Sequence, residues 1–165
     1  HGLAVGHHGL VGKQNMYDHS VRVPFLVVGP TVNAGSKIDA PIYLQDVVPT
    51  ALELAGAPVD GVDFKSLLPL LKNEQAGHYD AIYGAYLDRQ RMVTKGDWEL
   101  ISYPNIGVER LFNLKKDQNE MNDLVNNPEY ALKLSELRAG LSELSQSMAD
   151  PLLAETTAKP TRKRQ

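Results

Sequence analysis

The sequence predicts a mixed α/β protein, in which the end of an α/β sheet is followed by a small antiparallel sheet packed with a C-terminal helix. Three observations predict it: a continuous apolar run at 23–28, four short strand-like segments between 82 and 114, and an apolar stripe of helical period after Pro128. The chain has 165 residues, 42% of them hydrophobic and 22% charged, which is enough to form a core.

The apolar run extends from Val23 to Val28 and is ended by Gly29 and Pro30. Its apolar residues are continuous rather than alternating, which is typical of a strand covered on both faces, as in a parallel sheet flanked by helices. We therefore expect a buried strand here. Without the strands that flank it, this segment would expose apolar surface and a sheet edge.

A helix is predicted to begin with Asp46 as its cap and to run to about Ala55. Pro49 falls in its first turn, where a missing N–H costs little, and Gly56 follows its end. Its expected apolar face consists of Val48, Ala51, Leu52 and Ala55. A short packed segment is expected at Leu67 to Leu71.

Four strands are predicted next, because short apolar segments alternate with turn residues. They cover residues 82–87, 91–94, 99–103 and 110–114. Strands spaced this closely predict an antiparallel sheet.

Pro128 opens a long helix with one narrow apolar stripe, which we expect to pack onto that sheet. The stripe consists of Tyr130, Leu134, Leu137, Leu141, Leu144 and Met148. The chain thus divides into residues 1–78, the end of the α/β domain, residues 79–150, the sheet and helix, and a flexible tail at 151–165.

The composition excludes several classes of function. There is no cysteine, so neither a disulfide nor a thiolate metal site can form. The net charge of -3 gives no reason to expect nucleic acid as a partner, and the basic run from Lys159 to Arg164 is interpreted as a solvated tail. No apolar run approaches the roughly 20 residues of a membrane span. The first residue, His1, is not a methionine, which indicates a piece of a longer protein whose targeting segment could lie further upstream.

The first 20 residues contain four of the five histidines, glycines at positions 2, 6, 9 and 12, and Lys13. Glycines let the backbone turn sharply and approach a ligand, imidazoles can bind metal, and an ammonium group can bind an anion. A polar loop that leads into a buried strand is the usual position of an active site in an open α/β sheet. Composition alone indicates an anion or metal site.

The spacing of this loop resembles a signature of type I sulfatases, members of the alkaline-phosphatase superfamily. The pattern is His-Gly-x3-Gly-x-His-Gly-x2-Gly-Lys-x3-Tyr-Asp-x3-Arg-Val-Pro, from His1 to Pro24. Residues 46–56 resemble the helix that follows the active-site strand in this family, and residues 110–124 resemble its C-terminal strand and turn. The three matches, in the right order, cover about residues 1–125 and imply an alkaline-phosphatase-like fold.

The resemblance implies a sulfuric ester hydrolase that uses calcium and a formylglycine made from Cys or Ser. His1 matches the second member of the pair that binds the metal, and the acidic partner would directly precede it. Lys13 matches the catalytic lysine and would hold a sulfate oxygen as a compact charge. His8 would line the substrate pocket or cap a turn.

The other polar residues of the loop are expected to have structural roles. His7 and His19 are interpreted as structural or exposed, and Tyr17 as a packing residue. Asp18 would cap a helix or pair with Arg22, which is expected to be a buried ion-pair partner.

The nucleophile motif, Cys or Ser followed by x-Pro-x-Arg, is absent from this chain. We therefore expect the chain alone to be inactive and to require the N-terminal part of the same protein. A sulfated carbohydrate is the expected substrate, with a pocket built partly from residues 86–89 and 103–108, and the family implies a periplasmic or secreted protein. Two alternatives remain: a phosphomonoester or phosphonate hydrolase of the same superfamily, and a non-catalytic interaction module.

Overall fold

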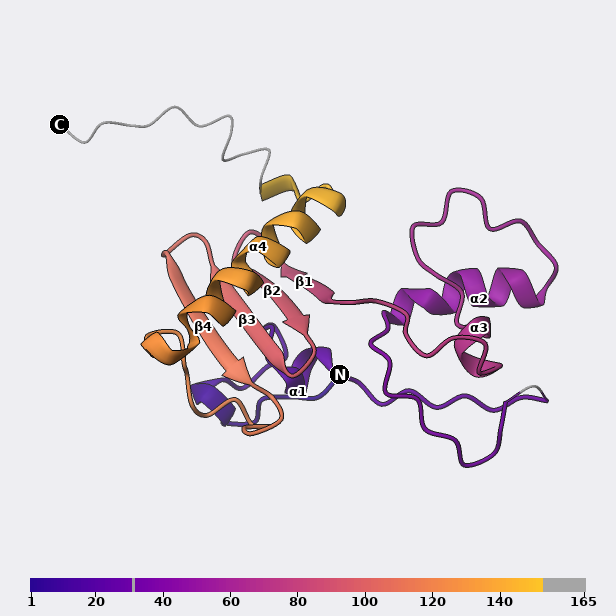
Figure 1. The fold of residues 1–165 in the computed structure, drawn as a ribbon, viewed down its shortest axis with the longest axis horizontal. Helices are drawn as coiled ribbons and strands as arrows, with labels where there is room; N and C mark the ends of the chain where they lie inside the picture. The colour runs from indigo at the N-terminus through magenta and orange to yellow at the C-terminus, as the bar shows by residue number, and fades with distance from the viewer. Residues whose placement is uncertain (31, 153–165) are drawn as a thin grey trace. The chain divides into compact units, whose positions relative to one another are not determined.

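The computed structural model describes residues 1–30 and 32–152, which fold as two compact units (Figure 1). Unit 1 combines residues 1–23 with the chain from residue 83 onward, and unit 2 is residues 24–82. The predicted boundary at 78/79 lies near the second junction. The predicted first domain, however, is divided, because residues 1–23 pack with the antiparallel sheet. Most of the predicted tail, including its basic run, lies outside the described residues.

Unit 1 is built on a four-stranded sheet in the order β1-β2-β3-β4. The strands are β1 (Ile82–Tyr86), β2 (Gln90–Lys95), β3 (Trp98–Tyr103) and β4 (Val108–Asn113). β3 pairs antiparallel with both β2 and β4. The predicted strands are confirmed to within one or two residues at each end.

Both faces of this sheet are apolar in the middle. The register places Val93 opposite Leu100 and Leu100 opposite Leu111, and none of these side chains is exposed. The other face carries the buried residues Met92, Ile101 and Phe112. A sheet that is apolar on both sides needs a cover on each.

One cover is the C-terminal helix α4 (Ala131–Ser147), which follows the short turn η3 (Pro128–Tyr130) and packs on β2 and β3. Leu134 and Leu137 of the predicted stripe are buried, as expected. Beyond the helix, Asp150 accepts hydrogen bonds from Nε and Nη2 of the buried Arg91 side chain on β2, at 2.5 and 2.7 Å. This bidentate pair fixes the end of the helix region to the sheet.

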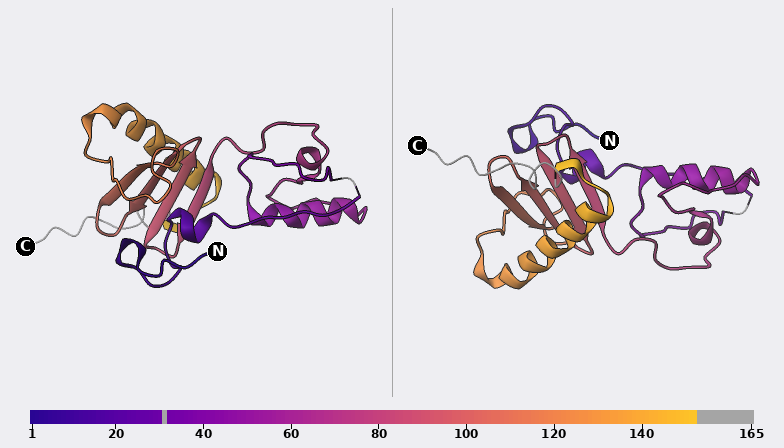
Figure 2. Two further views of the ribbon diagram at one scale, coloured as in Figure 1. Left: turned by 90° about the horizontal axis from the view of Figure 1, so that it is seen from below. Right: turned by 90° about the horizontal axis from the view of Figure 1, so that it is seen from above.

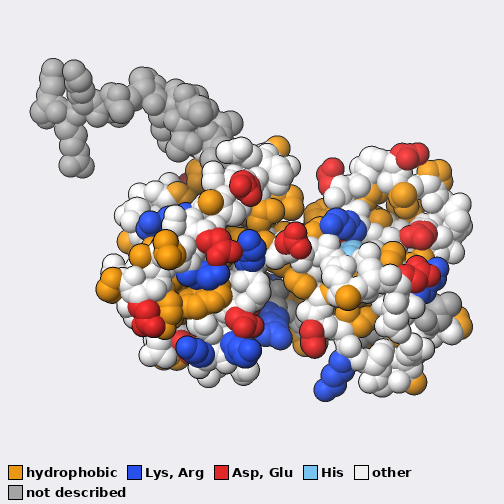
Figure 3. All heavy atoms as spheres, viewed as in Figure 1, with side chains coloured by type: hydrophobic (Ala, Val, Ile, Leu, Met, Phe, Trp, Pro, Cys, Tyr) orange, Lys and Arg blue, Asp and Glu red, His pale blue; other side chains and the backbone are white. Residues whose placement is uncertain are grey.

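Ion pairs also connect α4 to the sheet at the surface. Lys95 contacts Glu136 at 3.1 Å and Arg138 contacts Glu109 at 2.5 Å. Acidic and basic side chains are accordingly interspersed over this part of the molecule (Figure 3). Exposed pairs of this kind contribute little to stability, about 0–1 kcal/mol each.

The second cover is the histidine- and glycine-rich loop at the N-terminus, which lies on the sheet face opposite α4 (Figure 2). Met16 and Tyr17 form a core cluster with Met92, Ile101 and Phe112. The predicted packing role of Tyr17 is confirmed. The sheet core therefore holds the loop that carries the candidate site.

A buried pair of carboxyl groups joins this loop to the sheet. Glu99 on β3 and Glu120, which follows β4, are both buried and hydrogen-bond to each other, and Glu120 Oε2 also accepts the backbone N–H of Asp18 at 2.9 Å. Burial raises the pKa of both groups, and the bond to Glu120 raises that of Glu99 further. Glu99 is thus the protonated member, which donates to Glu120.

In unit 2, the apolar run at 23–28 is extended, but it forms no strand in the described part of the chain. The side chains of Leu26 and Val28 are 92% and 99% exposed. The prediction of a strand covered on both faces is therefore wrong for this chain, because no described strand pairs with it. The apolar surface that we expected without flanking strands is present.

The predicted helix of unit 2 forms as η2 (Leu44–Asp46) and α2 (Val47–Leu54), with Gly56 after its end at φ 67°. Its predicted apolar face is largely exposed; Val48, for example, is 54% exposed. The expected packed segment is confirmed as α3 (Leu68–Leu71), where Leu68 and Leu70 are buried.

Asp46 occupies the N-cap position of α2, as predicted, but its side chain caps the preceding turn η2 and not α2. The carboxylate is fully buried and accepts hydrogen bonds from the Tyr43 N–H at 2.8 Å, the Lys65 N–H at 3.2 Å and the Tyr79 hydroxyl at 2.7 Å. His78 Nε2 lies 3.3 Å from Oδ2 of the Asp46 carboxylate. Asp46 thus joins three segments of unit 2.

Among the described residues, no helix has both the length and the apolarity to cross a membrane.

Replacing Asp46 should destabilise unit 2, because three donors would lose their shared acceptor inside the protein. We expect Asp46→Ala to lower the free energy of unfolding by about 3 kcal/mol, measured by urea denaturation. The exposed Asp39→Ala should change it by less than about 0.5 kcal/mol. Equal effects of the two substitutions would contradict the buried network.

The Glu99–Glu120 pair should make stability depend on pH. Both pKa values are raised in the folded state. The contribution of the pair to the free energy of unfolding is therefore complete below the ordinary carboxyl pKa and is lost as the pH rises through the pKa values of the folded protein. We expect wild type to lose stability relative to Glu99→Gln as pH rises above the ordinary carboxyl pKa, by up to about 1.4 kcal/mol per pH unit and proton. Unfolding curves across this range measure the difference. The exposed Glu143→Gln is the control, and a difference that is constant with pH would refute the shared proton.

Candidate functional site

The loop at residues 1–19 is closed by its own backbone hydrogen bonds. The N–H of Gly2 donates to the carbonyl of His19 at 2.8 Å, that of Ala4 to Gly12 at 3.0 Å, and that of Gly6 to Leu10 at 2.7 Å. Gly2 allows this approach, since a Cβ there would lie 2.5 Å from the His19 oxygen. Gly6 takes φ 97°, which favours glycine.

Closure of the loop brings together two of the predicted site residues. Lys13 Nζ lies 2.7 Å from His1 Nε2, although the residues are twelve positions apart. An ammonium group can only donate, so this imidazole nitrogen is the acceptor. Both side chains are exposed, so the Lys13 ammonium group is accessible to an anionic ligand.

The loop is also fixed to the sheet by polar contacts. The Met16 N–H donates to Gln90 Oε1 at 3.0 Å, and Asp18 donates through its N–H to Glu120. Asp18 begins the short helix α1 (Asp18–Val21) and pairs with Arg22 at 3.6 Å, one of its two predicted roles. The Arg22 side chain, however, is 78% exposed, so the prediction of a buried partner is wrong.

His8 lies in the 3-10 turn η1 (His7–Gly9) and does not pair with Lys13 or His1. Its ring stacks on Tyr17 with centroids 3.9 Å apart. Burial lowers its pKa, as do the neighbouring His7 and His19, while a hydrogen bond to the Asn119 backbone acts in the opposite direction. Its Nε2 is buried and has no hydrogen-bond partner among the described residues.

His7 and His19 lie close to His8. Metal-ligating nitrogens of the three rings are all within 4.8 Å of one another. Burial also lowers the pKa of His19, with His7 adding to the effect. No sequence pattern assigned these two histidines a common role, because they are twelve positions apart.

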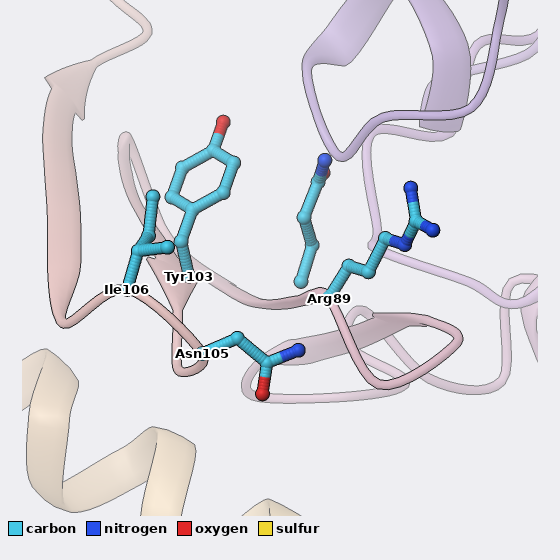
Figure 4. A pocket seen from close by; sticks show the side chains of 5 residues that line it. Arg89, Tyr103, Asn105 and Ile106 are labelled. Carbon is cyan, nitrogen blue, oxygen red and sulfur yellow. The ribbon is translucent and has the colours of Figure 1, made fainter.

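Two shallow pockets lie beside this loop. The first, of about 320 Å³, is lined by Arg89, Gln90, Tyr103, Asn105 and Ile106. Figure 4 shows Tyr103 and Ile106 on one side of it and Arg89 on the other. The Asn105 amide crosses towards the Arg89 turn and donates to the Asp88 carbonyl at 2.9 Å. Apart from Gln90, these residues come from the two segments expected to build a substrate pocket.

The second pocket, of about 220 Å³, is lined in part by His8, and the role of His8 in a substrate pocket stays a prediction. It shares Gln90, Tyr103 and Ile106 with the first pocket, so the two pockets are neighbours, and together they are called the groove below. Gln14, the neighbour of Lys13, also lines it. Sequence reasoning missed Gln14, Gln90 and Arg110 as lining residues, since no motif or periodicity distinguishes them.

The loop by itself does not fit a calcium ion. Calcium takes about six to eight oxygen ligands, whereas His1 supplies a nitrogen that accepts a hydrogen bond from Lys13. Most ligands of a calcium ion would have to come from residues outside this loop.

Comparisons with known proteins agree with the sequence pattern. The family model for the C-terminal part of N-sulphoglucosamine sulphohydrolase matches residues 6–147. The chain is 30% identical to arylsulfatase K of Danio rerio over 138 residues, which are 76% of this chain and 26% of that protein. It is 31% identical to an N-acetylglucosamine-6-O-sulfatase of Bacteroides thetaiotaomicron over 163 residues, 90% of this chain and 29% of that one. The chain therefore spans between a quarter and a third of the length of these relatives.

Solved structures give the same result. One, in complex with its substrate D-glucosamine-2-N,6-O-disulfate, superposes with a TM-score of 0.79 at 29% identity and covers 88% of this chain and 32% of that chain. A phosphonate monoester hydrolase from Silicibacter pomeroyi superposes with a TM-score of 0.76 at 19% identity, over 88% of this chain and 33% of that one, which shows a shared fold. The family-model match over most of the sequence shows that this chain belongs to the sulfatase family of the alkaline-phosphatase superfamily and corresponds to the C-terminal part of a sulfatase.

Proposed function

We propose that this chain is the C-terminal part of a sulfuric ester hydrolase and that its loop at residues 1–19 forms one side of the sulfate site. The observation that carries the proposal is the pairing of Lys13 with His1, at 2.7 Å, by the closed loop of a sulfatase-family chain. Lys13 would neutralise a sulfate oxygen as a point charge. His1 would turn its ring nitrogen to the edge of the metal site.

Sulfatases in general use a metal ion and a formylglycine nucleophile. We propose that calcium and formylglycine are the forms used here and that both depend on sequence outside this chain, which has neither a cysteine nor the serine motif. Calcium would supply Lewis-acid chemistry when bound. Residues 1–78 would then complete an α/β domain, in which the exposed run at 23–28 pairs with further strands, and residues 79–150 would form its sheet-and-helix subdomain.

A sulfated sugar is the proposed substrate. The groove beside the loop combines the Tyr103 ring, the Asn105 amide and the Arg89 guanidinium, which suit a sugar face, a hydroxyl group and a second anionic group respectively. An N-acetylglucosamine-6-O-sulfatase and a glucosamine disulfate complex among the similar proteins support this choice. Such an enzyme would work in the periplasm or outside the cell.

Removing the Lys13 ammonium should reduce sulfate release. We expect Lys13→Ala in the full-length protein to lower kcat/KM for a fluorogenic sulfate by roughly 100-fold, with calcium present, and Lys13→Arg to retain more activity. The phosphate analogue is measured in parallel. Release of phosphate alone would assign the protein to the phosphatase and phosphonate-hydrolase branch. Undiminished sulfate release by Lys13→Ala, or sulfate release by the 165-residue chain alone, would contradict the proposed roles.

The groove should affect the choice of substrate more than the chemistry. We expect Arg89→Ala to lower kcat/KM for a glucosamine disulfate by about tenfold, or about 1.4 kcal/mol, and to change that for a small aryl sulfate little. Lys115→Ala, an exposed cation whose side chain is 77% accessible, is the matched control. An equal loss on both substrates would argue against a sugar-binding role for Arg89.

A further inference from the structure

Three histidines of the N-terminal loop form a cluster that the proposed sulfate chemistry does not use. His7 and His8 belong to η1, and His19 belongs to α1 at the other end of the loop. Their ring centroids are 5.4 Å apart for His7 and His8, 6.2 Å for His7 and His19, and 6.0 Å for His8 and His19. Each ring offers a nitrogen within 4.8 Å of the other two.

The inner nitrogens of this cluster have no partner. Nε2 of His8 and Nε2 of His19 are both buried, and neither makes a hydrogen bond within the described residues. A buried polar atom without a partner is unfavourable, and native proteins usually satisfy it with a neighbour, a water molecule or an ion. The cluster is therefore arranged to receive a ligand.

The surroundings of His8 prepare its Nε2 as an electron-pair donor. The nearby Asn119 backbone raises the pKa of His8, as a carbonyl acceptor beside an imidazole does, and Nε2 is the ring nitrogen that is buried without a partner. Nε2 then carries the lone pair. A metal-binding histidine typically donates its second nitrogen to a backbone carbonyl in this way. Stacking on Tyr17 fixes the plane of the ring.

Charge also favours the ligating form. Burial and mutual repulsion lower the pKa of His8 and His19, so both rings are neutral at neutral pH. The charged groups near them are Arg110, which lowers the pKa of His8 further, and Asp18, which raises that of His19. The effect of Asp18 is the smallest of those acting on His19.

We propose that His7, His8 and His19 form a binding site for a transition-metal ion, with zinc as the best fit. Three neutral imidazoles suit zinc, which binds histidine nitrogen at about 2.0–2.1 Å and often keeps its fourth position open. In that geometry the three nitrogens lie about 3.3 Å apart, so binding would draw the rings together from their present separation of up to 4.8 Å. Calcium prefers oxygen and would not compete.

A bound ion would join η1 to α1. These elements are the two ends of the segment that contains Lys13, and backbone bonds already close the loop at Gly2 and Ala4. The ion would add a side-chain link between the same ends. Binding should therefore stabilise the loop, as any ligand specific for the folded state does.

The site can be tested by titrating zinc into the full-length protein with calcium in excess, so that an oxygen-rich site is already filled. Calorimetry measures affinity, cobalt absorption reports tetrahedral nitrogen ligation, and thermal melting reports stabilisation. We expect one ion per chain and a higher Tm. His19→Ala and His7→Ala should each weaken binding by at least the roughly 10–100-fold that loss of an outer-shell partner costs.

Two further variants separate this site from other histidines. His78→Gln removes a histidine from unit 2, and His1→Ala removes the one paired with Lys13; both should bind zinc as wild type does. Zinc binding that persists in His19→Ala, or that is lost in His1→Ala but not in His7→Ala, would overturn the proposal. Circular dichroism without metal shows whether each variant is folded, and a misfolded His19→Ala is replaced by His19→Gln.

Discussion

The constraint on which unit 1 depends is the need to cover both faces of a narrow, four-stranded sheet. Helix α4 covers the face formed by Val93, Leu100 and Leu111, as its apolar stripe requires. The N-terminal loop covers the face with Met92 and Phe112 through Tyr17. A polar, glycine-rich loop thereby becomes part of the core, and its chemistry is held on a rigid support.

Polar contacts then determine how the loop lies on that support. Glu120 accepts the Asp18 N–H and shares a proton with Glu99, while Gln90 accepts the Met16 N–H. The backbone bonds from Gly2 and Ala4 close the loop, and they place Lys13 next to His1 on one side. The same closure brings together the imidazoles of His7 and His8 in η1 and His19 in α1. A single packing arrangement thus accounts for both the proposed sulfate contact and the proposed zinc site.

Unit 2 has a different internal organisation. Its centre is the buried carboxylate of Asp46, which satisfies donors from three segments, rather than an extensive apolar core. Its apolar run and the outer face of α2 remain exposed. Leu26 and Val28 are exposed in this chain, which spans about a quarter to a third of the length of its relatives.

The sequence by itself determined the local elements and the family. Turn residues at short intervals located all four strands, the 4-3 spacing of leucines located α4, and the spacing from His1 to Pro24 identified a sulfatase loop. Periodicity and motif spacing are local, so they can be read along one chain. Only the tertiary structure decided which surfaces were covered and which side chains met. The Asp46 side chain became a buried acceptor instead of a cap of α2, Arg22 remained exposed, and the run at 23–28 found no strand to pair with, because each outcome depends on segments distant in the sequence. The meeting of His8 with His19 has the same cause, since the sheet folds the loop back on itself and no local pattern encodes that contact.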